Sequence, residues 1–449
     1  MKSNKPKIAV IGANARALAK SAKSAGYETY LVDYFSDLDT LKSADHVFSM
    51  QKNPLEPNFR EEYSREKLTD FAVEKLNGKV ENVLLASSIG SDSGMIEKLK
   101  NYFKISGNNP GQVGRARNWE ILMKIFNEFK INYPGTLIFD GFCALQNNMG
   151  NLKIPYPVVI KPSVEKEFQT GLIDNEFQLN NFLDDAKEKF KFKNKELRGK
   201  ILIQEFIEGM PASASILSDG KCAIVLSINR QLIGIQKLNA PGRFTYCGYV
   251  IPAKLNNNLK SKISKITGKI ISELGLVGSV GIDFVLKNNE FYFMEVNPRF
   301  QDTIDAVEKL ASLSLRPRHA SQGLASYDSA IAKFPRITRK HRNINLVEEH
   351  LKALDGKLNI NLNINFANNN TNNTNNTEKY FAKGILFANK KIKTGNLSNI
   401  SNICDIPAEG TVIHEGEPVC TIFAEGKNEP LAMENLFKKV KLINYRQGN

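Results

Sequence analysis

The chain opens with short apolar runs separated by an amphipathic stretch. Lys7–Gly12 (KIAVIG) is apolar and ends in glycine, and Glu28–Asp33 (ETYLVD) is a second apolar run that ends in an acid. Between them, residues 15–26 (ARALAKSAKSAG) carry the spacing of a helix. This order predicts a strand, a helix and a parallel strand, which is one βαβ unit.

A third apolar run, Val83–Ala86, leads into the small-residue loop SSIGSDSG at residues 87–94. Ligands of open α/β sheets collect where the strands end, so this loop is an expected contact surface. Ser88 is a candidate substrate contact, although a turn or capping role suits an isolated serine better than catalysis. The turn residues of SGNNPGQVG, at 106–114, predict a first domain boundary.

The middle of the chain changes to antiparallel patterning. Two amphipathic stretches predict helices, and the runs GIDFVL and FYFMEV, joined by the turn KNNE, predict a hairpin. The expected helices are Asn118–Lys130 and Leu259–Leu274, and the further expected strands are Pro157–Lys161, Ile201–Phe206, Ala212–Leu217 and Ala223–Ser227.

The composition changes again beyond about residue 320. Residues 359–377 are rich in asparagine and too poor in large apolar residues to pack, so they are expected to be disordered. The segments after this tract, from YFAKGILFANKKI to CDIPAEGTVIHEGEPVCTIFAEG, are predicted to form short strands joined by glycine turns. We therefore predict a mixed α/β and α+β protein with an α/β domain at 1–114, a two-lobed domain at 115–325 and a small β-rich domain at 326–449.

Composition narrows the classes of partner. The 449 residues carry a net charge of +14, which favours anionic ligands. Five scattered cysteines, no signal peptide and no apolar run of spanning length predict a cytoplasmic protein without a membrane partner. The most basic stretch, Lys333–Arg342, has no nucleic-acid motif around it and reads as a solvated loop. Small molecules are the expected partners, and a homodimer is an alternative that the sequence does not decide.

The hairpin carries the strongest candidate chemistry. In FYFMEVNPR, Glu295, Asn297 and Arg299 alternate, so a period of two places them on one face, and Asp283 on the preceding strand can face Glu295. Two carboxylates and an amide oxygen suit Mg²⁺ or Mn²⁺ carrying nucleotide phosphates. An ordinary hairpin with a polar outer face explains the pattern equally well.

The hairpin resembles the metal-binding end of the ATP-grasp superfamily, in which an acid precedes a strand reading E-x-N-x-R by about twelve positions. The resemblance implies an ATP-grasp fold, metal ligation by Asp283, Glu295 and Asn297, and a catalytic Arg299 that steadies the transferring phosphoryl group. ATP and Mg²⁺ (or Mn²⁺) are the implied cofactors.

Two upstream segments resemble the nucleotide end of the same family. PVVIKP resembles the strand whose lysine contacts ATP phosphates, and QEFIEG resembles the strand that clasps adenine. The residues implied there are Lys161, Gln204, Glu205, Phe206, Ile207 and Glu208. Two features depart from the family pattern. Where the family usually has a glycine-rich loop that folds over the phosphates as a lid, this chain has SVEKEFQTG at residues 163–171, with one glycine. Where the family usually has a phosphate-facing lysine, this chain has Asn118–Trp119.

The substrate end is less defined. Lys237 stands where related carboxylases place a lysine near the γ-phosphate, which implies a catalytic role. Arg243 and Tyr246, in GRFTYCG, suit a substrate carboxylate because a guanidinium offers paired donors, but loop packing explains them as well.

Several segments, including the N-terminal βαβ unit and DIPAEGTVIHEGEPVCTIFAEG, are similar to a biotin-carboxylase-like group of methanogens and methylotrophs that use tetrahydromethanopterin-linked metabolism. This resemblance implies a role in one-carbon coenzyme synthesis, such as that of methanofuran.

We expect an ADP-forming ligase that activates a carboxylate as an acyl phosphate for attack by an amine. One alternative is a bicarbonate-activating enzyme like biotin carboxylase, although the chain lacks the Met-Lys-Met signal of a biotin carrier. A second alternative is a nucleotide-dependent binding protein without turnover, which the glycine-poor lid supports.

Overall fold

The computed structural model describes residues 5–35, 37–51, 63–86, 89–148, 152–162, 170–192, 200–314, 344–358 and 379–446. Ser88, most of the predicted lid, the basic stretch at 333–342 and the asparagine-rich tract lie outside these residues. Within the described part, no helix combines the length and apolar character needed to cross a membrane.

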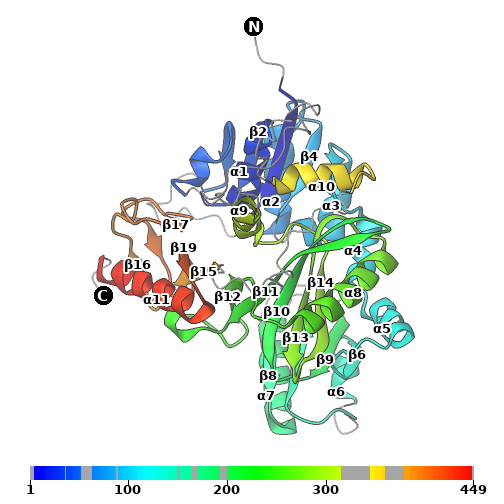
Figure 1. Ribbon diagram of the computed structural model, residues 1–449. Helices are drawn as coiled ribbons and strands as arrows, with labels where there is room; N and C mark the ends of the chain where they lie inside the picture. Colours follow the sequence, from blue (N-terminus) through cyan, green and yellow to red (C-terminus); the bar gives the residue numbers. More distant parts are fainter. Residues whose placement is uncertain are drawn as a thin grey trace, which may run out of the picture.

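The N-terminal domain is built on a parallel sheet in the order β3-β2-β1-β4-β5 (Figure 1). The predicted βαβ unit is confirmed, because β1 pairs in parallel with β2 through α1. The strands are β1 (Lys7–Gly12), β2 (Glu28–Asp33), β3 (His46–Ser49), β4 (Asn82–Leu85) and β5 (Lys104–Ile105). The helices are α1 (Arg16–Ser24), η1 (Thr40–Lys42), α2 (Arg65–Leu76), η3 (Ile89–Ser91) and α3 (Ser93–Lys100).

The turn cluster at 106–114 contains the start of a helix, α4 (Pro110–Arg117). Asn109 accepts from the backbone of Gln112, whose side chain accepts in return from Asn109, and Pro110 occupies the first turn. Asparagine and proline are also turn residues, so the capping box looks like a loop in the sequence. The next helix, α5 (Trp119–Phe129), follows at once and confirms the predicted one.

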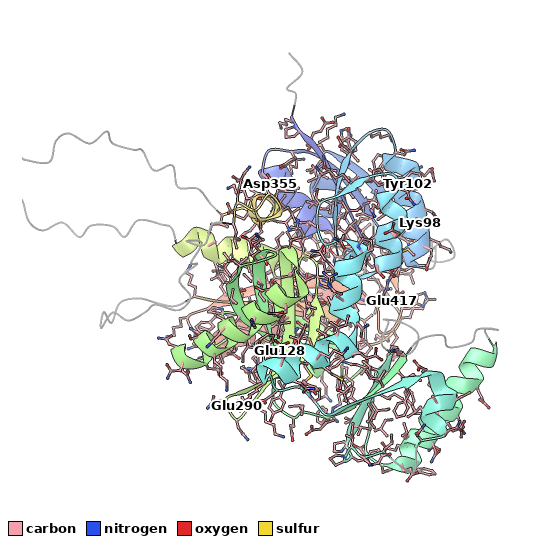
Figure 2. The ribbon with its side chains drawn as sticks, turned by 90° about the vertical axis from the view of Figure 1, so that its right-hand side faces the viewer. Lys98, Tyr102, Glu128, Glu290, Asp355 and Glu417 are labelled. Atoms are coloured by element: carbon pink, nitrogen blue, oxygen red, sulfur yellow. The ribbon has the colours of Figure 1, made fainter. Side chains whose placement is uncertain are left out.

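A four-stranded antiparallel sheet forms a lobe of its own, which projects from the body of the molecule in Figure 2. The strand order is β6-β9-β7-β8, and Leu179 and Leu183 of α7 belong to the lobe's apolar core. Its elements are β6 (Thr136–Asp140), α6 (Gly141–Gln146), β7 (Val158–Pro162), β8 (Gly171–Ile173), α7 (Glu176–Phe192) and β9 (Lys200–Glu205).

The largest sheet has eight strands in the order β14-β13-β10-β11-β12-β15-β19-β17. Strands of the predicted C-terminal domain therefore continue the central sheet, because β15 pairs with β12. The strands are β10 (Met210–Asp219), β11 (Ala223–Ile233), β12 (Tyr246–Ile251), β13 (Val277–Lys287), β14 (Glu290–Asn297), β15 (Tyr380–Phe387), β17 (Ile403–Cys404) and β19 (Pro418–Gly426).

Helices cover this sheet and join it to the N-terminal domain. Helix α8 packs on β11, α11 packs on β15 and β19, and α10 packs between α1 and β13 (Figure 1). The remaining elements are η5 (Gln236–Leu238), α8 (Asn257–Leu274), α9 (Ile304–Ser314), α10 (Leu346–Leu354), β16 (Ile392–Lys393), β18 (Val412–Ile413) and α11 (Glu429–Arg446). The N-terminal domain is therefore joined to this sheet through α10, and the C-terminal strands are joined to it through the pairing of β15 with β12.

Candidate active site

The β13–β14 hairpin places two carboxylates opposite each other. Asn288 and Asn289 form its turn with φ of 53° and 62°, the left-handed conformation that tight hairpin turns require. From this turn the register brings Asp283 directly opposite Glu295, with a β-bulge immediately after that pair. The predicted pairing of these two side chains is therefore present in the fold.

Asn297 and Arg299 extend the same cluster. Asn297 Nδ2 donates to Asp283 Oδ2 at 3.0 Å, and Arg299 Nη2 approaches Asn297 Oδ1 at 3.4 Å. Arg299 also donates from Nε to Ser91 Oγ at 2.9 Å. A Cβ atom at Gly90 would come within 3.0 Å of Arg299 Cβ, so the N-terminal domain approaches this arginine very closely.

Two more cations face the carboxylates from other elements. Arg117, the last residue of α4, donates from Nη1 to Glu295 Oε1. Lys161, on β7, holds its Nζ 5.1 Å from the ring centroid of Trp119. Burial lowers the pKa of Lys161, and the negative charge of Glu295 opposes that shift. The cluster therefore draws on three separate segments for positive charge.

The surroundings shift the pKa values of the two carboxylates in opposite directions. Burial raises the pKa of Asp283 to about 7, and the nearby charge of Glu295 adds to the increase. Burial also acts against ionisation of Glu295, but the charges of Arg117, Lys161 and Arg299 together lower its pKa. Two partly buried acids that face each other repel when both are ionised, so a cation between them would offset that repulsion.

The donor set fits a hard divalent cation. Asp283, Glu295 and Asn297 present carboxylate and amide oxygens, and Mg²⁺ in nucleotide sites combines one or two carboxylates with phosphate oxygens and water. The described residues hold no cluster of three or more His, Cys, Asp and Glu side chains suited to a metal. A cation here would therefore depend on the amide and on ligand oxygens.

The predicted adenine segment begins at the end of β9, an interior strand of the lobe's sheet. Gln204 is buried and donates from Nε2 to Thr136 Oγ1 at 2.8 Å, so its side chain serves the sheet. Glu205 Oε2 accepts from Gly135 N at 3.3 Å, and Phe206 N donates to Pro157 O at 3.2 Å. Ile207 is buried and Glu208 is exposed.

The three predicted substrate-end residues that the structure describes separate from one another. Arg243 lies over the ring of Phe206, with its Cζ 5.2 Å from the centroid. Lys237 holds its Nζ 4.9 Å from the ring centroid of Phe437, on α11. The structure therefore directs Arg243 toward the adenine strand and Lys237 toward the C-terminal unit.

Tyr246 stays beside the carboxylate cluster. Its hydroxyl donates to Asp302 Oδ2 at 3.3 Å. Burial raises its pKa well above the usual value, and the charges of Asp302, Tyr249 and Asp283 add to the shift. The buried Lys383, on β15, binds the same Asp302. Tyr246 is thus a neutral donor at the substrate side of the cluster.

Sequence patterns gave no role to Arg117, Asp302 or Lys383, and they gave Ser91 only the turn or capping role expected of Ser88. The departure from the family at Asn118–Trp119 was the available signal for Arg117, because the missing cation stands one position earlier. Ser91 lies in the loop after β4 that was predicted as a contact surface. Asp302 and Lys383 are 81 residues apart, and nothing local links them.

A comparison with protein families agrees with this geometry. Residues 128–303 match the family model described as the ATP-grasp domain. The chain therefore contains an ATP-grasp domain, which confirms the resemblance read from the hairpin.

Relatives and solved structures extend the similarity beyond that domain. An uncharacterised protein of the methanogen Methanocaldococcus jannaschii is 25% identical over 419 residues, which cover 93% of this chain and 88% of the relative. The biotin carboxylase domain dimer of Hydrogenobacter thermophilus 2-oxoglutarate carboxylase, in complex with MgADP, ADP and bicarbonate, has a TM-score of 0.63 at 14% identity and covers 93% of this chain and 86% of that one. The L-amino acid ligase of Bacillus licheniformis has a TM-score of 0.62 at 15% identity, with 98% of both chains covered. At these identities the solved structures show a common fold.

Proposed function

We propose that the protein is an ATP- and Mg²⁺-dependent ligase that joins a carboxylate to an amine and releases ADP. The observation that carries the proposal is the pairing of Asp283 with Glu295, with Asn297 and Arg299 on the same strand end. A carboxylate oxygen of the substrate takes the γ-phosphoryl group of ATP, which gives an acyl phosphate and ADP. The amine then attacks the acyl carbon, phosphate leaves, and the amine loses a proton to solvent.

The chain's own residues supply position and charge in this reaction. Asp283, Glu295 and Asn297 would hold Mg²⁺, which offsets negative charge on the phosphate oxygens when it is bound. Arg299 faces the position of the transferring group and is oriented by Ser91. Arg117 and Lys161 add positive charge where the phosphates would lie. Phosphoryl transfer relies mainly on such positioning and charge, so the site needs no nucleophilic side chain.

The residues proposed to meet the adenine and those proposed to meet the substrate fit a single orientation of ATP and substrate in the site. Glu205 and the backbone of Ile207 would meet the adenine edge and Glu208 would reach the ribose, and Arg243 lies beside Phe206 at that end. Tyr246 lies beside the cluster with its hydroxyl donating to Asp302, and a substrate carboxylate bound there would accept this donor in place of Asp302. Lys237 remains a candidate only if α11 or the η5 segment moves, because its ammonium lies over Phe437.

We also propose a metabolic role, a compartment and an oligomeric state for the protein. The relative from a methanogen is in keeping with a role in one-carbon coenzyme synthesis, which we place in the cytoplasm. The dimeric carboxylase domain supports a homodimer, which light scattering of the purified protein measures directly.

Purified protein should be incubated with Mg²⁺, ATP and hydroxylamine and with pools of carboxylates. ADP together with a hydroxamate is the expected result, because hydroxylamine traps an acyl phosphate. ADP that forms only with bicarbonate would replace this proposal with a bicarbonate-activating enzyme. ATP binding without ADP in every pool would point to a binding protein that does not turn over.

A further inference from the structure

The backbone that carries Asn297 and Arg299 out of β14 is held at three consecutive carbonyl groups. Arg299 N donates to Asn297 O at 2.9 Å, and Gln301 Nε2 donates to Arg299 O at 3.0 Å, so these two bonds stay within the segment. The middle carbonyl, that of Pro298, accepts instead from Asn108, which lies 190 residues earlier in the chain. The backbone between the proposed metal ligand and the proposed phosphoryl contact is therefore held from outside.

Asn108 closes the open end of the β13–β14 hairpin. Its Oδ1 accepts from Val277 N at 2.8 Å, and its Nδ2 donates to Val277 O at 3.0 Å and to Pro298 O at 3.0 Å. Val277 is the first residue of β13, and Pro298 follows the last residue of β14. One side-chain amide therefore joins the two strands beyond their last paired residues, Gly281 and Asn297.

Both donors of this amide are used in a buried place. Asn108 is 5% exposed, and its two N–H groups have the carbonyl oxygens of Val277 and Pro298 as acceptors. Pro298 is itself buried. A buried carbonyl that loses its donor costs free energy, so removing the amide favours a shift of the segment toward another donor. Such a shift moves Asn297 and Arg299, which flank Pro298 in the chain.

The linker that carries Asn108 is bound to the neighbouring elements. His350 Nε2 lies 3.0 Å from Ser106 O, and Arg115 Nη2 donates to Leu274 O at 3.0 Å. Helix α4, which follows Asn108, packs on β14 (Figure 1). A side chain on a fixed backbone can place its partners accurately, and accurate placement is what the support of a catalytic site requires.

We propose that Asn108 is a positioning residue of the phosphoryl-transfer site, which sets the backbone that presents Asn297 to the metal ion and Arg299 to the phosphoryl group. This inference rests on the proposed function. Asn108 acts through the carbonyl of Pro298 and does not itself meet the nucleotide. Ser91 holds the guanidinium of Arg299 and Asn108 holds its backbone, so the N-terminal part of the chain supports both ends of this side chain.

The contribution of the metal ion to nucleotide affinity reports the placement of Asn297 without turnover. AMPPNP, an ATP analogue that is not hydrolysed, is titrated calorimetrically into the full-length protein, once with Mn²⁺ and once with EDTA. The ratio of the two dissociation constants is the gain that the metal ion supplies. We expect Asn108→Leu to reduce this gain by roughly tenfold or more, as the loss of groups that orient metal ligands does. The dissociation constant in EDTA should stay at the wild-type value.

The rate of ADP release from Mg-ATP reports the placement of Arg299. Asn108→Leu should lower it by roughly 10- to 100-fold, because small displacements at the reacting group cost much of the rate. Ile270→Ala is the control for lost stability, since Ile270 is a fully buried apolar residue of α8 whose truncation loosens the core without removing a side-chain hydrogen bond. This control should keep both the metal gain and the rate wherever circular dichroism shows it folded.

Glu295→Gln separates this inference from the proposed function. If Glu295→Gln keeps the metal gain, the metal assignment is wrong and the role of Asn108 is wrong with it. If Glu295→Gln loses the gain while folded Asn108→Leu keeps both the gain and the rate, Asn108 has no positioning role and the proposed function stands. Equal losses in Ile270→Ala and Asn108→Leu would also overturn the inference. Asn108→Ser, whose single hydroxyl cannot span both carbonyls, should show the same losses and decides the matter if Asn108→Leu does not fold.

Discussion

Arg299, two residues after the end of β14, donates from Nε to Ser91 Oγ of the N-terminal domain at 2.9 Å. The bond joins two segments 208 residues apart and fixes the direction of the guanidinium. A side chain that meets a transferring phosphoryl group has to be held in place, because small displacements cost much of the rate.

Ser91→Ala removes this acceptor and leaves the chain otherwise intact. We expect kcat to fall between roughly 10- and 100-fold because Arg299 loses its orientation, with little change in the dissociation constant of Mg-ATP. Ser93→Ala, at an exposed position of the following helix, is the matched control. Steady-state ADP release and nucleotide titration give the two numbers, and equal losses in both variants would remove the positioning role.

Arg117 compensates Glu295, and removing it should weaken nucleotide binding. Arg117→Met takes one positive charge from the place where the phosphates would lie, so the dissociation constant of Mg-ATP should rise by about tenfold or more. Lys124→Met, on the exposed face of α5, changes the net charge equally and should leave the affinity as it is. Isothermal titration of both variants with Mg-ATP checks this, and matching affinities would contradict the assignment.

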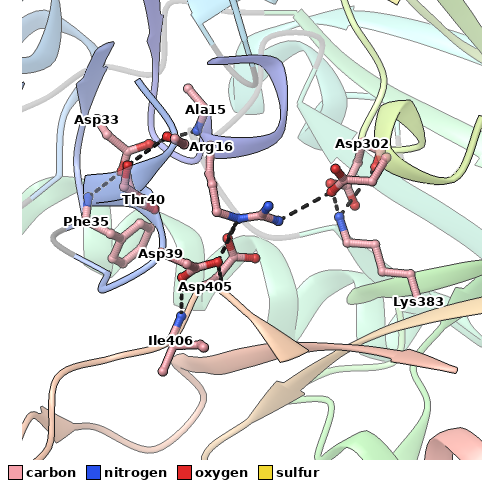
Figure 3. Close-up of polar contacts among 12 residues, drawn as sticks. Ala15, Arg16, Asp33, Phe35, Asp39, Thr40, Asp302, Lys383, Asp405 and Ile406 are labelled. Atoms are coloured by element: carbon pink, nitrogen blue, oxygen red, sulfur yellow. Dashed lines mark hydrogen bonds and ion pairs between the residues drawn. The ribbon is translucent and has the colours of Figure 1, made fainter. Parts of the chain in front are cut away.

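Arg16 neutralises a buried junction of the three units. It forms ion pairs with Asp39 at 3.2 Å, Asp305 at 3.4 Å and Asp405 at 2.7 Å, and its side chain is 5% exposed (Figure 3). Arg16→Met leaves these acids without their cation, which should lower the free energy of unfolding by about 3–5 kcal/mol. Lys23→Met breaks the half-exposed pair with Asp45 and should cost less than about 1 kcal/mol. Urea denaturation of the two variants measures the difference.

His350 should make the protein sensitive to acid. Burial lowers its pKa from 6.5 to about 4, and its Nδ1 already accepts from Ser279 N at 2.7 Å. The pKa is lower in the folded than in the unfolded state, so its stabilising contribution is complete above pH 6.5 and is lost as the pH falls toward 4. With about 1.4 kcal/mol per unit, this loss amounts to about 3 kcal/mol.

His350→Gln should flatten the fall in unfolding free energy between pH 6.5 and 4. Urea denaturation at several pH values follows it, with the exposed His414→Gln as the comparison. A variant whose unfolding free energy keeps the wild-type pH dependence would show that other groups cause the acid sensitivity.

Local patterns predicted the parts of the site that lie within one hairpin. The alternation in FYFMEVNPR and the turn KNNE placed Asp283 and Glu295 at the same end of one hairpin. An unbroken register from the turn would set Asp283 opposite Met294, and the β-bulge that brings Glu295 opposite Asp283 instead could not be read from the sequence. The N-terminal βαβ unit and the helix at 119–129 followed from the same kind of local signal.

Tertiary pairings could not be read in this way. Asp302 and Lys383 meet only because β15 continues the central sheet, and the sequence suggested a separate C-terminal domain. The segments that follow β1 to β3 likewise lie beside strands from the last 70 residues of the chain. The helix at Pro110 was hidden for a different reason, because its capping residues are also turn residues.

The central claim is that Asp283 and Glu295 form the metal-binding end of a phosphoryl-transfer site. Its most direct test is the rate of ADP release from Mg-ATP by Glu295→Gln, compared with Glu290→Gln on the same strand. Glu290 is exposed, pairs with Lys262 and is labelled in Figure 2, so its variant matches the change of charge outside the site. We predict that Glu295→Gln stays folded and loses ADP release by at least roughly a thousandfold, while Glu290→Gln keeps the wild-type rate. Undiminished ADP release by Glu295→Gln would contradict the account.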